Sequence, residues 1–160
     1  MSHLLNDALP ENRQEYFVGI VPHSHALGLR YVGHTPGRVT FDLPYRADLV
    51  GDPATGVIHG GVITTLIDAC AGQAVLTKLN AVRRIATLDL RIDYLRPALR
   101  GATVRCICEC YRMTRQVAFT RAICFDGDEN DPVATSAGTF MVFDDSESSH
   151  AAAGLLGEPL

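Results

Sequence analysis

The sequence lacks three features, and each absence narrows what the protein can do. It has no excess of basic residues: 14 Lys and Arg stand against 18 Asp and Glu, unlike a typical nucleic-acid-binding protein. Its first 16 residues mix acids and amides, whereas an export signal has a basic start and then an apolar run. The most apolar long stretch, residues 60–79, is interrupted by Asp68, Gln73 and Lys78 and is a poor membrane span. We therefore expect a cytoplasmic protein with neither nucleic-acid nor membrane partners.

Motifs for serine hydrolysis and metal binding are also missing. No G-x-S-x-G occurs, so the chain has no nucleophile elbow. Five cysteines are an odd number in a chain without an export signal, which indicates free thiols in a reducing compartment. Cys106, Cys108 and Cys110 alternate, so on a strand they would share one face as small buried side chains. Zinc sites usually use C-x-x-C turns instead, and we expect no metal site.

The chain is long enough for one well-buried core and divides into three segments. Residues 1–25 form an N-terminal segment, in which 11–21 predicts a short helix that Pro22 ends. Residues 26–143 form the folded domain. Residues 144–160 are rich in Ser, Ala, Gly and acids, and we expect a disordered tail.

Two periodicities fill the folded domain. Residues 60–79 carry apolar side chains at i, i+3 and i+4 and predict a buried helix of about five turns. Strand-like runs occur at 27–32, 37–45, 86–95, 102–113, 116–125 and 132–143. In the third run the alternation predicts Leu88 on one face with Leu90, and Thr87 on the opposite face. Together these patterns predict an α+β fold in which an antiparallel β-sheet wraps around one long central helix.

His59, Gly60 and Gly61 stand where the long helix would begin. Two glycines weaken a helix start, by up to about 1 kcal/mol each relative to alanine if they lie within it. They also leave the first helical N–H groups accessible. These groups have no intrahelical partner and carry the positive end of the helix dipole, so they can stabilise an oxyanion. Gly60 N–H is the preferred donor, and the alternative is that both glycines only allow close packing against a strand.

Asp68 lies in the most apolar part of this helix, where burying an unpaired carboxylate costs several kcal/mol. It is either a structural ion-pair or hydrogen-bond partner, or a general base or nucleophile tuned by desolvation. Eight residues separate Gly60 from Asp68, roughly 12 Å along a helix, which is too far for both to act on one carbonyl carbon. If two copies pack their helices antiparallel, Gly60 of one meets Asp68 of the other. A catalytic role therefore requires a homodimer with shared active sites.

The segments HGGVITTLID and TLDLRIDYLRPA resemble the hotdog-fold thioesterase superfamily, specifically the branch of phenylacetate-pathway (PaaI-like) thioesterases, from about Leu27 to Phe143. The resemblance implies hydrolysis of an acyl-coenzyme A thioester by a homodimer that assembles into a dimer of dimers. It implies that Gly60 donates its amide to the thioester carbonyl and that His59 supports that side. Asp68 would activate water or attack directly, and Thr87 would help to position the water.

The same resemblance implies where the rest of the substrate binds. Coenzyme A carries phosphates, and Arg83, Arg84 and Arg96 are the expected contacts, with Gly61 as a further substrate-binding residue. No cofactor is expected, because coenzyme A is part of the substrate. One departure is Pro53, where many relatives have an Asn that helps to bind the carbonyl; Pro has neither a side-chain amide nor a backbone N–H.

Two other functions stay open at this point. A non-catalytic acyl-CoA-binding protein of the same fold is one, because Pro53 replaces the Asn. A hotdog hydratase or dehydratase is the other, and it would use a His and acid pair on the reacting carbons. The spacing of His59 and Asp68 fits the thioesterase pattern better.

Overall fold

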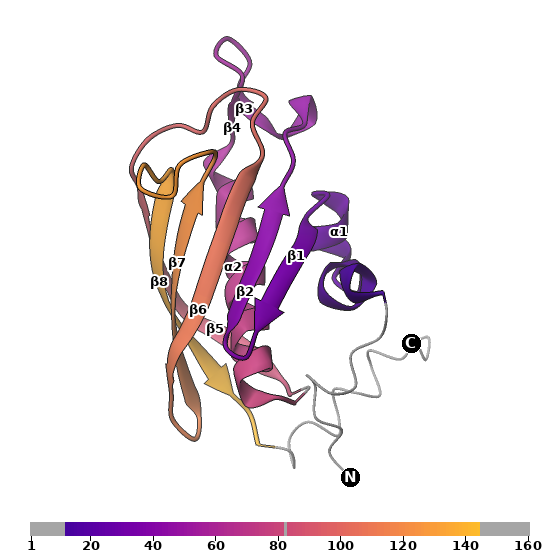
Figure 1. Ribbon diagram of the computed structural model, residues 1–160, viewed down its shortest axis with the longest axis vertical. Helices are drawn as coiled ribbons and strands as arrows, with labels where there is room; N and C mark the ends of the chain where they lie inside the picture. The colour runs from indigo at the N-terminus through magenta and orange to yellow at the C-terminus, as the bar shows by residue number, and fades with distance from the viewer. Residues whose placement is uncertain (1–11, 82, 145–160) are drawn as a thin grey trace.

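The computed structural model describes residues 12–81 and 83–144 (Figure 1); the predicted tail lies outside this range apart from its first residue. Its elements in chain order are the π-helix η1 (Glu15–Gly19), α1 (Pro22–Ala26), β1 (Arg30–Thr35), β2 (Arg38–Leu43), the 3-10 helix η2 (Ala47–Leu49), β3 (Val50–Asp52), β4 (Val57–Ile58), α2 (Gly60–Leu79), β5 (Ile85–Tyr94), β6 (Val104–Met113), β7 (Val117–Phe125) and β8 (Ala134–Val142). Six strands form one antiparallel sheet in the order β1-β2-β6-β7-β8-β5, and β3 pairs with β4. The predicted α+β fold is confirmed.

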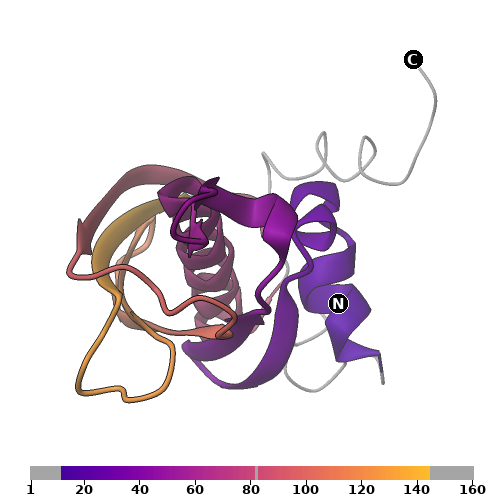
Figure 2. The same ribbon diagram turned by 90° about the horizontal axis from the view of Figure 1, so that it is seen from above.

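The sheet curls around α2, as the view from above shows (Figure 2). α2 begins at Gly60 and ends at Leu79, since Asn80 takes the left-handed conformation (φ 53°) that commonly closes a helix. By length and mean hydropathy (1.3) α2 could cross a membrane, but half of the tested window is buried inside the protein. This burial is the pattern of a core helix, because the sheet covers its apolar side chains.

The cysteines fill the space between α2 and the sheet. Cys106, Cys108 and Cys110 share the inner face of β6, as predicted, and each is at most 1% exposed. Hydrogen bonds with Cys124 and Cys70, together with burial, hold the pKa of the Cys106 thiol well above its ordinary value. That thiol therefore stays protonated and packs as a small apolar group. Within the part of the chain that the structure describes, no three His, Cys, Asp or Glu side chains are arranged to hold a metal ion.

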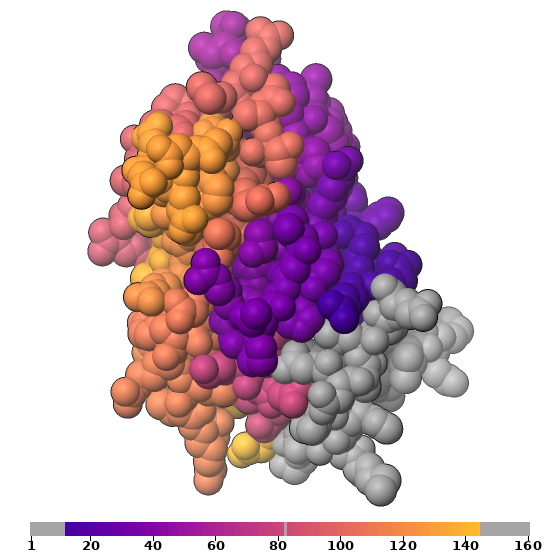
Figure 3. Space-filling model, in the orientation of Figure 1, coloured from indigo at the N-terminus to yellow at the C-terminus, as the bar shows by residue number. Residues whose placement is uncertain are grey.

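The N-terminal segment differs from the prediction of one helix over 11–21. Residues 13–19 are helical and end in η1, and Pro22 then begins α1, where a fixed φ and a missing N–H suit the first helical position. Phe17 and Val18 belong to the main core, and the Phe17 ring stacks on Tyr31 of β1 with centroids 4.8 Å apart. In the space-filling view this segment lies in indigo beside β1 and β2 (Figure 3). The boundary expected after residue 25 therefore falls within α1, and the segment packs on the same core.

β5 forms one edge of the sheet and carries a bulge at Leu88. Its pairing with β8 shifts immediately after Thr87, which opposes the buried Phe140. A bulge inserts one unpaired residue and so reverses which face the following side chains take. Thr87 therefore shares the inner side of the sheet with Leu90, and the prediction that it lies on the opposite face is wrong. Leu88 is 54% exposed.

Candidate active site

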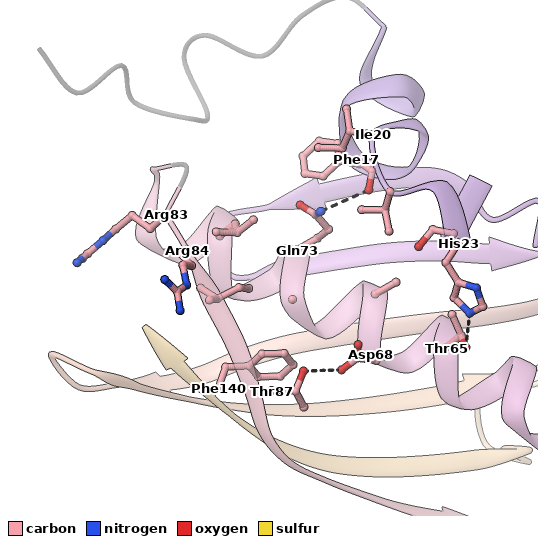
Figure 4. Close-up of a pocket in the computed structure, with 16 residues that line it drawn as sticks. Phe17, Ile20, His23, Thr65, Asp68, Gln73, Arg83, Arg84, Thr87 and Phe140 are labelled. Atoms are coloured by element: carbon pink, nitrogen blue, oxygen red, sulfur yellow. Dashed lines mark hydrogen bonds between the residues drawn. The ribbon is translucent and has the colours of Figure 1, made fainter. Parts of the chain in front are cut away.

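Asp68 of α2 and Thr87 of β5 meet at the wall of a cavity (Figure 4). Thr87 Oγ1 donates a hydrogen bond to Asp68 Oδ1 at 2.8 Å. The bulge at Leu88 makes this contact possible, because it turns Thr87 towards the helix. A carboxylate that accepts one such bond is held in one orientation and keeps its other oxygen free to accept a proton from water.

Asp68 is partly exposed in the single chain, which corrects the expectation of a buried carboxylate. Its neighbours Leu66 and Ile67 are fully buried, whereas Asp68 faces a cavity of about 560 Å³. A cavity of this size is typical of small-molecule sites. Desolvation within one chain therefore does not explain a reactive Asp68, and its position on the cavity wall does.

Apolar side chains form much of the cavity wall. α2 contributes Ala69, Gly72 and Leu76, which lie three or four residues apart and so share one helix face. The N-terminal segment contributes Ile20 and Val21, whose side chains are 59% and 41% exposed. Figure 4 shows Ile20 across the cavity from Thr87. The cavity is therefore an apolar pocket with the Asp68 carboxylate on its wall.

Arg83 and Arg84, which precede β5, lie at one end of this pocket (Figure 4). The Arg84 guanidinium lies 4.1 Å from the centroid of the Phe143 ring, and Arg83 forms an ion pair with Asp144 at 3.5 Å. The structure thus brings two of the three predicted phosphate-binding arginines to the cavity.

Two further polar side chains line the cavity. His23 Nε2 lies 3.3 Å from Thr65 Oγ1, and the Thr65 hydroxyl donates to Gly61 O at 3.1 Å. With its proton used in that way, Thr65 accepts from His23. Gln73 Nε2 donates to Phe17 O at 3.4 Å and so ties α2 to the N-terminal segment. Both contacts hold that segment against the cavity.

The start of α2 is capped by His59. The His59 Nδ1 accepts a hydrogen bond from the Gly61 N–H at 2.9 Å. A ring nitrogen that accepts carries no proton, so the proton of the neutral imidazole lies on Nε2. Gly60 N–H is the first of the helix and has no intrahelical partner, which leaves it available as a donor.

The two halves of the predicted site are separate within one chain. Asp68 and Thr87 line the cavity. His59, Gly60 and Gly61 are not among the described residues that line it. About 12 Å of helix lies between Gly60 and Asp68. One chain therefore does not bring both groups to the same carbonyl.

Arg96 lies elsewhere, in an ion-pair cluster. Its guanidinium forms two hydrogen bonds to the Asp126 carboxylate, at 2.6 and 3.1 Å, and an ion pair with Asp131 at 2.9 Å. Hydrogen bonding to Arg96 holds the pKa of Asp126 below its ordinary value. Arg96 does not line the cavity of the single chain, and its guanidinium is paired with Asp126 and Asp131. Its predicted contact with substrate phosphates stays a prediction.

Pro53 lies in the exposed turn between β3 and β4. The Ala54 N–H in that turn donates to Asp52 Oδ1 at 3.0 Å. Pro53 has no N–H and no polar side chain, so it cannot bind a carbonyl oxygen. Any donor to the thioester carbonyl must come from another residue.

Comparisons with known proteins identify the family. Residues 55–133 match the family described as Thioesterase superfamily. Over 141 residues the chain is 30% identical to the medium/long-chain acyl-CoA thioesterase YigI of Salmonella typhimurium, and the match covers 80% of this chain and 90% of YigI. The chain belongs to the thioesterase superfamily. The predicted resemblance is therefore confirmed, and the protein is a thioester hydrolase.

Two solved structures are similar to this chain in sequence and fold. A protein from Pseudomonas aeruginosa is 38% identical with a TM-score of 0.73, and the match covers 86% of this chain and 98% of that one. A mutant of the phenylacetic acid degradation protein PaaI from Thermus thermophilus is 29% identical with a TM-score of 0.67. That match covers 76% of this chain and 99% of the other.

Sequence reasoning missed several residues of this thioesterase's site. Ile20 and Val21 fall in the predicted N-terminal segment, outside the predicted folded domain, although two adjacent apolar residues before Pro22 are a usable signal. Tyr94 is also missed, although its hydroxyl donates to Gly60 O at 2.9 Å. No local sequence signal predicts this contact, because it depends on how β5 packs against the start of α2.

Proposed function

We propose that this thioesterase hydrolyses an acyl-coenzyme A to the free acid and coenzyme A. The observation that carries the proposal is the Asp68 carboxylate, oriented by Thr87 at the wall of an apolar cavity. Asp68 removes a proton from water while the water oxygen attacks the carbonyl carbon. The resulting oxyanion is stabilised by a Gly60 N–H, and its collapse breaks the C–S bond. The departing thiolate takes the proton from Asp68, which regenerates the carboxylate.

The proposed site is shared between two copies of the chain. β5 supports this arrangement: it is an edge strand, and Leu88, Tyr94 and Leu95 at this edge are each more than half exposed. If β5 pairs with its own copy about a two-fold axis, the two α2 helices run side by side in opposite directions. Gly60 of one chain then lies near Asp68 of the other. We propose a dimer of this kind, which associates further into a dimer of dimers.

We propose that the acyl group is of medium to long chain length, the class that the name of YigI gives. The cavity supports this class, because its apolar wall continues from Asp68 along α2 to Leu76 and faces Ile20. An alkyl chain that covers these side chains gains about 0.8 kcal/mol per buried methylene. A two-carbon acyl group would leave most of this wall uncovered.

Coenzyme A would bind at the charged end of the cavity. Arg83 and Arg84 are the proposed contacts for its phosphates, since both line the cavity and their guanidinium groups suit phosphate oxygens. Gly61, next to the Gly60 N–H donor at the start of α2, is the remaining residue that we propose to bind substrate. The reaction needs water and no cofactor, and free thiols such as Cys106 suit the reducing cytoplasm in which we place it.

Thiol release from a panel of acyl-CoAs tests the reaction, with phenylacetyl, benzoyl, short aliphatic and long aliphatic esters. We expect the wild type to turn over at least one ester and Asp68→Asn to lose about 100-fold or more in kcat while still binding it. Asp128→Asn, the same chemical change in the exposed β7–β8 turn, should behave as wild type. If wild type and Asp68→Asn bind equally and neither releases thiol, the proposal is wrong and a non-catalytic acyl-CoA-binding role replaces it.

A further inference from the structure

Tyr94, at the end of β5, is hydrogen-bonded to the first turn of α2. Its hydroxyl lies 2.9 Å from Gly60 O and 2.7 Å from Thr64 Oγ1. Thr64 Oγ1 also lies 3.2 Å from Gly60 O. Each hydroxyl has one proton to donate. Both protons lie in the two shorter contacts if Thr64 donates to Tyr94 and Tyr94 donates to Gly60 O. Tyr94 is therefore the closer hydroxyl donor to the carbonyl of Gly60.

This contact reaches His59 through a single peptide group. The Gly60 carbonyl belongs to the same peptide as the Gly61 N–H, which donates to His59 Nδ1 at 2.9 Å. Hydrogen bonds in a chain polarise one another, so a carbonyl that accepts a bond makes the N–H of its own peptide a stronger donor. Tyr94 therefore strengthens the bond that keeps Nδ1 of His59 unprotonated and its proton on Nε2.

The β3 strand holds His59 from its other side. A Cβ added at Gly51 would lie 2.9 Å from His59 Cα and 3.2 Å from its Cδ2, so the close approach requires a glycine. The His59 N–H donates to Leu49 O at 2.9 Å. With its backbone, Cδ2 and Nδ1 all in contact with the protein, the ring of this exposed residue has Nε2–H left to donate outwards.

We propose that Tyr94 is a positioning residue that, through the Gly60–Gly61 peptide, holds His59 with its Nε2–H available to the thioester carbonyl. This inference rests on the proposed hydrolysis. It gives the developing oxyanion two donors, the Gly60 N–H and the His59 Nε2–H. The second donor takes over the contribution that Pro53 cannot make.

Tyr94→Phe tests the positioning role, because it removes only the hydroxyl. We expect kcat to fall roughly three- to tenfold with KM unchanged. In a His59→Ala background the same change should leave kcat nearly unaltered, since no imidazole remains to be positioned. Tyr111→Phe, a half-exposed tyrosine on β6, is the matched control and should behave as wild type. An equal fall in both His59 backgrounds overturns the proposal.

The 15N NMR signals of His59, assigned by comparison with His59→Ala, provide a readout that does not need turnover. We expect a proton on Nε2 and a bare Nδ1 in the neutral wild-type ring, and a mixture of the two forms in Tyr94→Phe. A wild-type ring protonated on Nδ1 overturns the proposal whether or not any ester is hydrolysed. Absence of thiol release with the Nε2–H form intact refutes the hydrolysis instead, so the two failures are distinguishable.

Discussion

Thr87→Val is the substitution that separates orientation of Asp68 from packing around it. Valine has nearly the same shape and suits a strand, so only the hydroxyl that donates to Asp68 Oδ1 at 2.8 Å is lost. A hydrogen bond to a charged group contributes about 1.5–3 kcal/mol. Because Thr87 is exposed and Asp68 is partly exposed to solvent, we take the lower value, about 1.5 kcal/mol. If that energy acts in the transition state, kcat falls roughly tenfold.

Thiol-release kinetics and thermal unfolding check this prediction together. We expect an unchanged KM and a free energy of unfolding that falls by no more than about 1.5 kcal/mol, the contribution of the lost hydrogen bond, so that the variant stays folded. Thr135→Val on β8, whose side chain lies away from the cavity, is the control and should retain full activity. A Thr87→Val protein with wild-type kcat would show that Thr87 does not orient the base, and the bulge in β5 would then have no role in catalysis.

Two other predictions concern the cavity wall and the ion pair between Arg96 and Asp126. Ile20→Ala should lower kcat/KM about five- to tenfold for long-chain acyl-CoAs and leave kcat/KM for short-chain acyl-CoAs unchanged, because it removes apolar contact at the cavity wall. Val32→Ala, at another exposed apolar residue on β1, is the control and should change kcat/KM for neither class. A uniform loss across chain lengths would exclude a role in chain-length selection. Asp126→Asn should lower the free energy of unfolding by about 3 kcal/mol, since it weakens a pair whose acid is 1% exposed. Arg96 holds the folded pKa of Asp126 below its ordinary value, so this stabilisation is complete above that ordinary pKa and is lost as the pH falls through the folded pKa. Acid unfolding curves of wild type and Asp126→Asn should therefore converge at low pH, and parallel curves would refute the pairing.

The elements that could be predicted are those whose signal is local. Apolar residues recur every three or four positions over 60–79 and every second position over β6. The structure buries these residues on α2 and in the inner row of cysteines on β6. The start of α2 could be predicted because the apolar helical periodicity begins at Gly60, directly after His59. The prediction for Pro22 is wrong because a proline marks a break in a helix, and the local sequence does not distinguish a helix that ends there from one that begins there.

By itself, the sequence determined the α+β architecture, the family and the separation of Gly60 from Asp68, because each follows from periodicity, motif and the fixed rise of a helix. Only the tertiary structure decided which side chains surround Asp68. A one-residue bulge, invisible in an alternating pattern, reverses the face of Thr87 and brings it to the carboxylate. Tyr94 reaches Gly60 across 34 positions of chain, and Ile20 reaches the cavity from outside the predicted domain. Contacts of this kind depend on how helices and strands pack against one another, and the local sequence pattern does not determine that packing.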